Sequence, residues 1–260
     1  MPDERVNYDT IAPAYHHRYA VNSLRGVATE LHSLVQKCKA EAILEVGCGT
    51  GRWLAELRAD ARLVCGLDLS PGMLRQAREH LPEAPLVCGR ANQLPFAEAA
   101  FDLVFCVNAI HHFDQPQVFI AEARRLLRPG GALAVICMDP HTGRDRWYLY
   151  DYFEGTREAD LRRFPSGGMV LDWMTAAGFH SVEWQAAERV QNRLMGRDVL
   201  DSHFLQKHGT SQLALLTDEA YTAGLSKIKA ALAEAEAVGT TLVFPVDIWL
   251  TMLTGWAPGE

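Results

Sequence analysis

The sequence predicts an α/β fold built on a doubly wound, mostly parallel sheet. Short apolar runs alternate with segments of helical periodicity, a pattern typical of βαβ units. A glycine-rich loop lies between the first apolar run and the next helical pattern, within residues 42–54. The run at 101–107, apolar except for Asp102, has the character of a central strand buried on both faces. At 260 residues, the chain is long enough for one sizeable domain with insertions.

The first half of the chain is expected to alternate helix and strand. Apolar residues at helical spacing predict helices over 24–38 and 117–127, and the glycine loop leads into a helix near residue 53. Ser70 is a candidate N-cap with Pro71 at the first helical position, which predicts a helix over 71–80. The strands expected in this half are residues 43–46, 63–67, 86–88, 101–107 and 132–137.

The glycine loop indicates a nucleotide-like ligand, because it exposes bare backbone beside a positive helix N-terminus. Gly47, Gly49 and Gly51 form G-x-G-x-G, and Arg52 stands where a dinucleotide fingerprint has its last glycine. A nicotinamide dehydrogenase is therefore disfavoured. Glu45 precedes the loop and places a carboxylate where it suits an ammonium group better than a pyrophosphate. S-adenosylmethionine carries that ammonium and no phosphate.

A second acidic residue supports this interpretation. Asp68 follows the apolar run at 63–67, at the tip of the second strand, where a carboxylate can accept hydrogen bonds from a ribose diol. With these motifs the chain resembles the class I S-adenosylmethionine-dependent methyltransferases over residues 8–139. It is most similar to the small-molecule group that includes the ubiquinone and menaquinone biosynthesis methyltransferases. The resemblance implies a Rossmann-like fold, S-adenosylmethionine as cofactor, S-adenosylhomocysteine as product and a small-molecule acceptor.

The resemblance also implies contacts around the cofactor. An N-terminal arm is expected to fold over the ligand, with Tyr8, Tyr15 and Arg18 closing the site and Arg18 pairing with the cofactor carboxylate. The other predicted cofactor-binding residues lie at the strand ends and in the loops that follow them: Glu45, Gly47, Cys48, Gly49, Gly51, Asp68, Leu69, Met73, Ala91, Asn92, Asn108 and Ala109.

Recognition of the adenine departs from the family pattern at Arg90. The family usually has an acidic residue there that accepts a hydrogen bond from the adenine amino group, whereas an arginine can only donate. Two alternatives remain: the backbone around Ala91 recognises the base, or a side-chain carbonyl of Asn92 or Gln93 does so.

The catalytic residues are less evident than the cofactor residues, because a base is required only when the acceptor loses a proton. The candidates are His112, His111, Tyr15 and Tyr150, although packing is the favoured role for the two histidines. Two alternatives to methyl transfer stay open. One is a non-methylating reaction on the same fold, and the other is a binding module without catalysis that has lost adenine recognition at Arg90.

Beyond residue 139 the resemblance no longer identifies individual residues. A helix is expected over 168–177, and strands six and seven over 181–190 and 241–251, with strand seven antiparallel in a seven-stranded sheet. The intervening residues 191–240 are too many for a hairpin loop and have helical patterns at 198–207 and 217–237, so they are expected to form a cap or lid.

Five aromatic residues after the fifth strand are candidates to line an acceptor pocket, hydrophobic or cationic in character, although packing of a helix face on the sheet is the favoured explanation for any one of them. They are Trp147, Tyr148, Tyr150, Tyr152 and Phe153. The expected layout is one methyltransferase domain, with an N-terminal helical cap at 1–40, a core at 41–190 and 241–260, and the cap insertion at 191–240.

Composition limits the partners and the compartment. The net charge of −7 and the lack of any basic run argue against nucleic acid or an anionic membrane as partner. No apolar run approaches the ~20 residues needed to span a membrane, and no signal region begins the chain. The six cysteines form no C-x-x-C motif, which favours free thiols over disulfides or a metal site. We expect a cytoplasmic monomer or homodimer.

Overall fold

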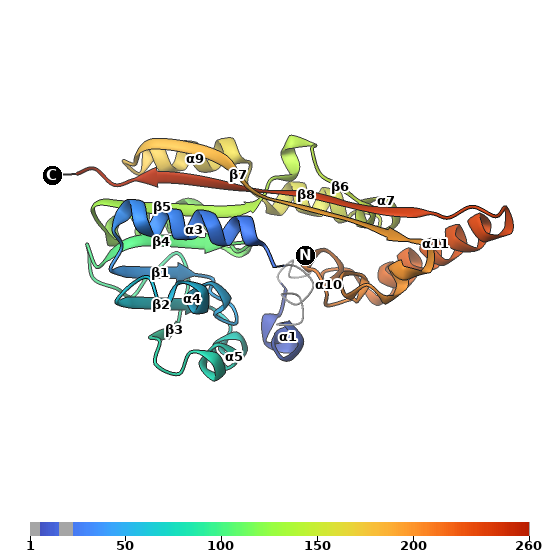
Figure 1. The fold of residues 1–260 in the computed structure, drawn as a ribbon, viewed down its shortest axis with the longest axis horizontal. Coiled ribbons are helices and arrows are strands. Elements are labelled where there is room, and N and C mark those ends of the chain that lie inside the picture. The colour runs from blue at the N-terminus through green and yellow to red at the C-terminus, as the bar shows by residue number, and fades with distance from the viewer. Residues whose placement is uncertain (1–5, 16–22, 260) are drawn as a thin grey trace.

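The structure is a computed structural model that describes residues 6–15 and 23–259. Its central feature is a sheet with strand order β3-β2-β1-β4-β5-β8-β6, in which β7 also pairs with β8. Figure 1 shows this sheet on the left, with helices on both faces and a long two-stranded ribbon leading to a helical region on the right. The predicted α/β class is confirmed, with a mostly parallel sheet and an antiparallel last strand that pairs with the strand before it.

Parallel pairing joins β1 to β2 and β4, β2 to β3, and β4 to β5, whereas β8 runs antiparallel to β5, β6 and β7. The short β6 was not predicted. The strands are β1 (Ala42–Val46), β2 (Leu63–Asp68), β3 (Leu86–Cys88), β4 (Phe101–Val107), β5 (Leu127–Met138), β6 (Arg146–Trp147), β7 (His180–Met195) and β8 (Val243–Trp256).

Two helical layers cover the sheet, because alternate residues of each buried strand point to opposite faces. One face packs against α3 and α4 through Ile43, Leu103 and Phe105, and the other packs against α6 and α9 through Leu44 and Val104. The helices of this core are α3 (Arg25–Cys38), α4 (Arg52–Leu57), α5 (Pro71–His80), α6 (Pro116–Leu126) and α9 (Gly167–Ala176). At the start of α5, the predicted cap is present, since the Ser70 hydroxyl accepts from the Met73 amide at 3.1 Å.

Strand β5 begins earlier than predicted. Leu127 pairs with Phe101 and the ladder resumes at Ala132 opposite Leu103, so residues 128–131 form an irregularity within the strand instead of a separate turn before it. Arg128 holds this irregularity in place by bonding the Asp102 carboxylate at 2.9 Å.

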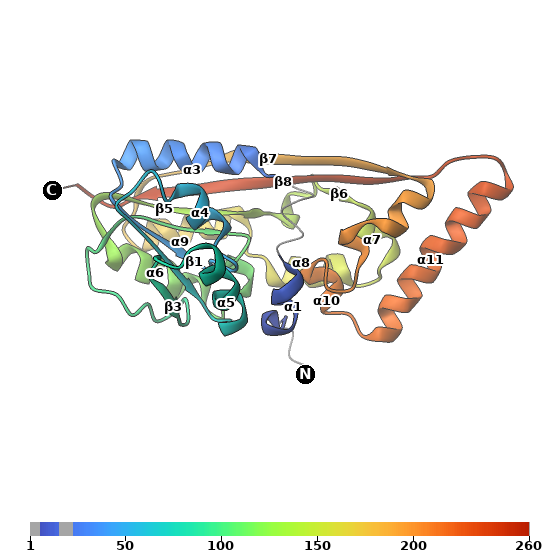
Figure 2. The same cartoon turned by 60° about the horizontal axis from the view of Figure 1, so that its bottom comes forward.

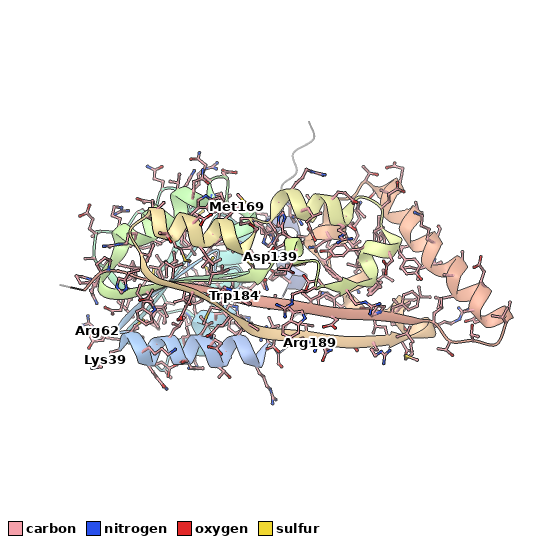
Figure 3. The ribbon with its side chains drawn as sticks, turned by 90° about the horizontal axis from the view of Figure 1, so that it is seen from above. Lys39, Arg62, Asp139, Met169, Trp184 and Arg189 are labelled. Carbon is pink, nitrogen blue, oxygen red and sulfur yellow. The ribbon has the colours of Figure 1, made fainter. Side chains whose placement is uncertain are left out.

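Strands β7 and β8 are longer than predicted and pair as far as Met195 opposite Val243. Beyond the sheet they form a ribbon, visible in both Figure 1 and Figure 2. Seen from above, β7 carries Trp184 and Arg189 and runs between α3 and α9 (Figure 3). Arg189 makes a cross-strand ion pair with Asp247 at 2.8 Å. The helical insertion is therefore residues 196–242, the loop at the tip of this ribbon.

The insertion shares a hydrophobic core with the segment after β5. Tyr148 and Phe153 are fully buried there, against Leu205, Ile228 and Phe244. Residues 198–207, predicted to be helical, form two 3₁₀ turns, η3 (Gly196–Asp201) and η4 (His203–Leu205). The remaining helices are α1 (Tyr8–Tyr15) in the arm, α7 (Tyr148–Tyr152) and α8 (Thr156–Arg163) after β6, and α10 (Ser211–Ala214) and α11 (Asp218–Ala237) in the insertion. Two further 3₁₀ turns, η1 (Ile110–His112) and η2 (Pro140–Thr142), follow β4 and β5.

No helix in the ranges 6–15 and 23–259 combines the length and the apolar character that crossing a membrane requires.

Contact between α11 and Phe153 provides a test of how the insertion is held. A Cβ added to Gly224 would lie 2.2 Å from Cδ1 of Phe153, a residue that is only 1% exposed. We expect Gly224→Ala to lower the free energy of unfolding by about 1–3 kcal/mol in urea titrations, because overpacking forces the helix away.

Gly168→Ala is the matched control, since this glycine is also helical and a Cβ there would meet no atom closer than 4.0 Å. A Gly224→Ala protein as stable as the Gly168→Ala protein would contradict the packing of α11 on Phe153.

Candidate functional site

A cavity of about 260 Å³ opens at the carboxyl ends of β1, β2 and β4. This is where ligands bind in open α/β sheets. The glycine loop after β1 forms its floor: Gly47 has φ 75°, and a Cβ on it would lie 2.5 Å from the Cβ of Ala109. Only glycine allows the loop to lie this close to the end of β4. Asn108 follows β4 with φ 51°, a left-handed conformation that asparagine tolerates.

Asp68 ties the two sides of the cavity together. One carboxylate oxygen accepts from the Gly49 amide and the other from the Ser70 amide, both at 2.8 Å. Burial raises the pKa of Asp68, although the hydrogen bonds from Ser70 and Gly49 lower it in part. Each oxygen of a carboxylate can accept more than one hydrogen bond, so Asp68 keeps the capacity to bind hydroxyl groups of a ligand.

Glu45 is a buried acid whose charge is poorly compensated. Its residue is 1% exposed, and its Oε2 atom has no hydrogen-bond partner among the described residues. Burial raises the pKa of Glu45 well above its usual range, and the neighbouring Asp68 raises it further. Because an unpaired buried carboxylate is costly, a cationic group of a ligand in the cavity would relieve this cost.

The N-terminal arm closes one side of the cavity. The Asp9 carboxylate oxygen Oδ1 accepts from the Ser70 hydroxyl and the Gly72 amide, both at 2.7 Å, which docks α1 on the N-terminus of α5. These two hydrogen bonds lower the pKa of Asp9. The next contact inward is between the Tyr8 hydroxyl and Nε2 of His112, at 2.6 Å.

Nearly all the cofactor-binding residues predicted from the sequence line this one cavity. Arg18 lies outside the described residues. Gly51 is the exception among the described ones: it precedes α4 with φ 79°, and a Cβ there would meet Leu81 and Ala77, so its role is in packing. Those that line the cavity are Tyr8, Tyr15, Glu45, Gly47, Cys48, Gly49, Asp68, Leu69, Met73, Ala91, Asn92, Asn108 and Ala109.

Sequence reasoning missed several residues of the cavity. Asp9 was not singled out, although it lies beside Tyr8 in the arm. Arg90 and Asp114 both line the cavity and form an ion pair at 2.9 Å, so an acidic group lies near the position where the family pattern has one. Only the fold brings Asp114 next to Arg90, and no local sequence signal joins them. Gln93, an alternative for adenine recognition, is absent from the described lining.

A second cavity of about 170 Å³ adjoins the first. Six residues line both cavities and lie between them: Tyr8, Tyr15, Trp53, Val107, Asn108 and His112. His111 lines only the second cavity, where its ring stacks on Phe164 with 3.8 Å between centroids. The insertion contributes Phe204, Thr210, Ser211 and Gln212 to the wall.

The aromatic residues after β5 divide between the two roles considered from the sequence, a pocket wall and packing. Of the five, only Trp147 lines the second cavity, and Tyr148, Tyr152 and Phe153 pack in the core of the insertion. Tyr150 lines neither cavity; its hydroxyl donates to the fully buried Asp160 at 2.7 Å, and burial raises its pKa. A high pKa and an occupied hydroxyl do not suit a base, and the structure does not bring Tyr150 to the site.

The fold and the site together define a class of protein. The sheet is doubly wound, with a glycine loop after its first strand and acidic residues at the ends of its first two strands. Residues 44–135 match the family model described as a methyltransferase domain. Residues 44–135 are thus similar to methyltransferase domains.

Individual relatives agree with this assignment. A malonyl-[acyl-carrier protein] O-methyltransferase from Herminiimonas arsenicoxydans is 36% identical over 62% of this chain and 60% of its own length. A demethylmenaquinone methyltransferase from Renibacterium salmoninarum is 34% identical over 52% of this chain and 58% of its own. The chain thus spans less than two thirds of these curated relatives.

Among solved structures, Haemonchus contortus phosphoethanolamine N-methyltransferase 2 in complex with S-adenosyl-L-methionine has a TM-score of 0.59 at 18% identity. The match covers 96% of this chain and 57% of that one. At this identity the similarity concerns the fold.

The unpaired Glu45 leads to a prediction about stability. Because the folded state raises the pKa of Glu45 above its ordinary value of 4.5, its contribution to stability is present below that pH and is lost as the pH rises toward the folded value. Glutamine carries no charge at any of these pH values. We expect Glu45→Gln to exceed the wild type in stability at pH 8 by about 1 kcal/mol or more, with a smaller difference at pH 5.

Thermal melts of both proteins at the two pH values measure this, with Glu234→Gln on the exposed face of α11 as control. A lower melting temperature for Glu45→Gln at pH 8 than for the wild type would show that the carboxylate is already well paired.

Proposed function

We propose that this protein is an S-adenosylmethionine-dependent methyltransferase acting on a small molecule. The observation that carries the proposal is the first cavity, which brings together a buried carboxylate with one unpartnered oxygen, a bare glycine loop and a second acid. A ligand with an ammonium group, a ribose and no phosphate matches these three features.

The residues of the cavity fit the cofactor. Glu45 would bind the ammonium group, because its Oε2 atom is buried and without a partner. Asp68 would accept the ribose hydroxyls, while the exposed backbone of Gly47 and Gly49 gives the ligand close access. Leu69, 55% exposed at the rim, offers an apolar surface to the adenine. Arg18 as partner of the cofactor carboxylate stays a prediction.

When bound, the cofactor supplies an electrophilic methyl group on a sulfonium. The chain's own task is to align the acceptor with that group and to exclude water. His112 and Tyr15 line both cavities, so of the predicted bases they are the best placed, whereas His111 lines only the second cavity.

We also propose a layout for the chain, with residues of the N-terminal arm and of the 191–240 region as caps over one methyltransferase core. The residues of the insertion in the wall of the second cavity support this layout. A small-molecule acceptor, and a monomer or homodimer in the cytoplasm, remain the expectation from the sequence.

Calorimetric titration with S-adenosylhomocysteine tests the proposal. We expect the wild-type protein to bind it, and Asp68→Ala to lose about ten-fold or more in affinity, because that variant removes both the ribose acceptor and the anchor of the glycine loop. Asp172→Ala, on the exposed surface of α9, should bind as the wild type does.

Absence of binding to the wild type would contradict the cofactor assignment and favour a different ligand. Binding that is unchanged in Asp68→Ala would remove the ribose role. Detection of S-adenosylhomocysteine after incubation with S-adenosylmethionine and an acceptor separates methyl transfer from a reaction that leaves the cofactor intact.

A further inference from the structure

We propose that one face of the ribbon formed by β7 and β8 is a docking surface for another protein, whose contacting surface is acidic. None of the residues of this face lines either cavity, so docking is a role separate from cofactor binding. The residues that make up this arginine face are Arg144, Arg146, Arg189, Arg193, Trp184 and Trp249.

Strand pairing brings the arginine side chains to one side of the ribbon. Residues paired across an antiparallel ladder point to the same side, and successive residues along a strand alternate. On β8, Pro245, Asp247 and Trp249 therefore share one side. One ladder partner of each of these positions is an arginine, in order Arg193, Arg146 and Arg189.

The opposite side of the same ribbon is apolar. Val246, Ile248 and Leu250 alternate along β8 with the positions that carry the arginine partners, and they line the second cavity together with Val190 of β7. The arginine face is thus the side of the ribbon that points away from that cavity.

Trp249 holds two of the arginines in place. The Arg144 guanidinium lies 4.4 Å from the centre of the Trp249 ring, and the Arg189 guanidinium lies 4.7 Å from it. Guanidinium groups stack favourably on aromatic rings, and Arg189 is fixed further by its ion pair with Asp247 at 2.8 Å. Side chains that are already ordered lose less conformational freedom when a partner binds.

Positive charge is exposed on this face, whereas the acids of the region are partly covered. Arg144, Arg146 and Arg193 are exposed, and none of them makes an ion pair within the described part of the chain. The acids are half-buried and accept hydrogen bonds from the protein itself: Asp139, Asp145 and Asp247. A chain with a net charge of −7 therefore presents a local surface of the opposite sign.

An exposed tryptophan extends the arginine face along β7. Trp184 is 58% exposed and pairs with Leu253, which lies an even number of positions from Trp249 and so points to the same side of β8. In Figure 3, Trp184 and Arg189 lie along β7 between α3 and α9, and no helix crosses over them. Tryptophan and arginine are enriched among the residues that dominate binding energy in protein interfaces. The composition of the face is thus that of a protein-binding surface.

Protection of an edge strand does not account for the whole face. Charged side chains on an edge such as β7 do keep strands of other molecules from pairing with it. Arg144 and Arg146, however, lie outside β7, and an exposed tryptophan favours association instead of preventing it.

The distribution of charge favours an acidic protein over other partners. A two-fold contact between copies of this chain would place the arginines of one copy against those of the other. A nucleic acid or an anionic membrane extends beyond this face and would also meet the acidic remainder of the chain. A protein can present carboxylates opposite the arginines alone.

Titration calorimetry at low salt tests the surface with a defined probe, a helical peptide of about 20 residues with glutamates on one face and leucines on the other. We expect the wild-type protein to bind it, and Arg144→Glu and Arg193→Glu each to weaken binding about ten-fold or more, because reversed charge repels the probe. Trp184→Ala should weaken binding several-fold. Arg58→Glu, exposed at the end of α4, is the matched control and should bind as the wild type does.

Thermal melts of the same variants show that each is folded, so that loss of the surface is distinguished from loss of the fold. No binding of the peptide by the wild type, or equal binding by the charge-reversed variants, would contradict the docking surface. Tighter binding of poly-uridine RNA or of phosphatidylglycerol vesicles than of the peptide would overturn it in favour of those partners. A dimer in sedimentation that dissociates in Arg193→Glu would overturn it in favour of a second copy.

Discussion

The Asp68 carboxylate is the constraint on which the rest of the site depends. It accepts the Gly49 amide on one side and the Ser70 amide on the other, and so fixes the glycine loop against the start of α5. Ser70 in turn caps α5 and donates to Asp9, which docks the N-terminal arm. One partly buried acid at the tip of β2 therefore orders the floor, one wall and the cover of the first cavity.

Stability and ligand binding make opposite demands at the neighbouring Glu45. A carboxylate with a buried, unpaired oxygen beside Asp68 destabilises the empty fold, because both acids lose hydration and repel each other. The same arrangement gives a cationic ligand a strong partner. Local conflict between folding and binding of this kind is expected at functional sites.

The long ribbon gives the molecule its second cavity. Pairing of β7 with β8 continues well past the sheet, and the insertion at its tip folds around Tyr148 and Phe153 into a core of its own. That core places Phe204, Ser211 and Gln212 opposite the end of β4. The insertion thus contributes to the second cavity, whereas the first is lined by the ends of the strands, the loops after them and the N-terminal arm.

The sequence by itself determined the sheet, the glycine loop and the acids at its strand ends, because each depends on local periodicity or on spacing within one βα unit. It predicted the residues of the first cavity well for the same reason, since the ends of neighbouring parallel strands meet at one edge. Only the tertiary structure decided the rest. Of the five aromatic residues after β5, only Trp147 lines the second cavity, and the Tyr150 hydroxyl donates to the buried Asp160. Tertiary packing also pairs Asp114 with Arg90 and places the Tyr8 hydroxyl against His112. Each of these contacts joins segments whose meeting depends on how helices and the ribbon pack, and no periodicity within either segment encodes it.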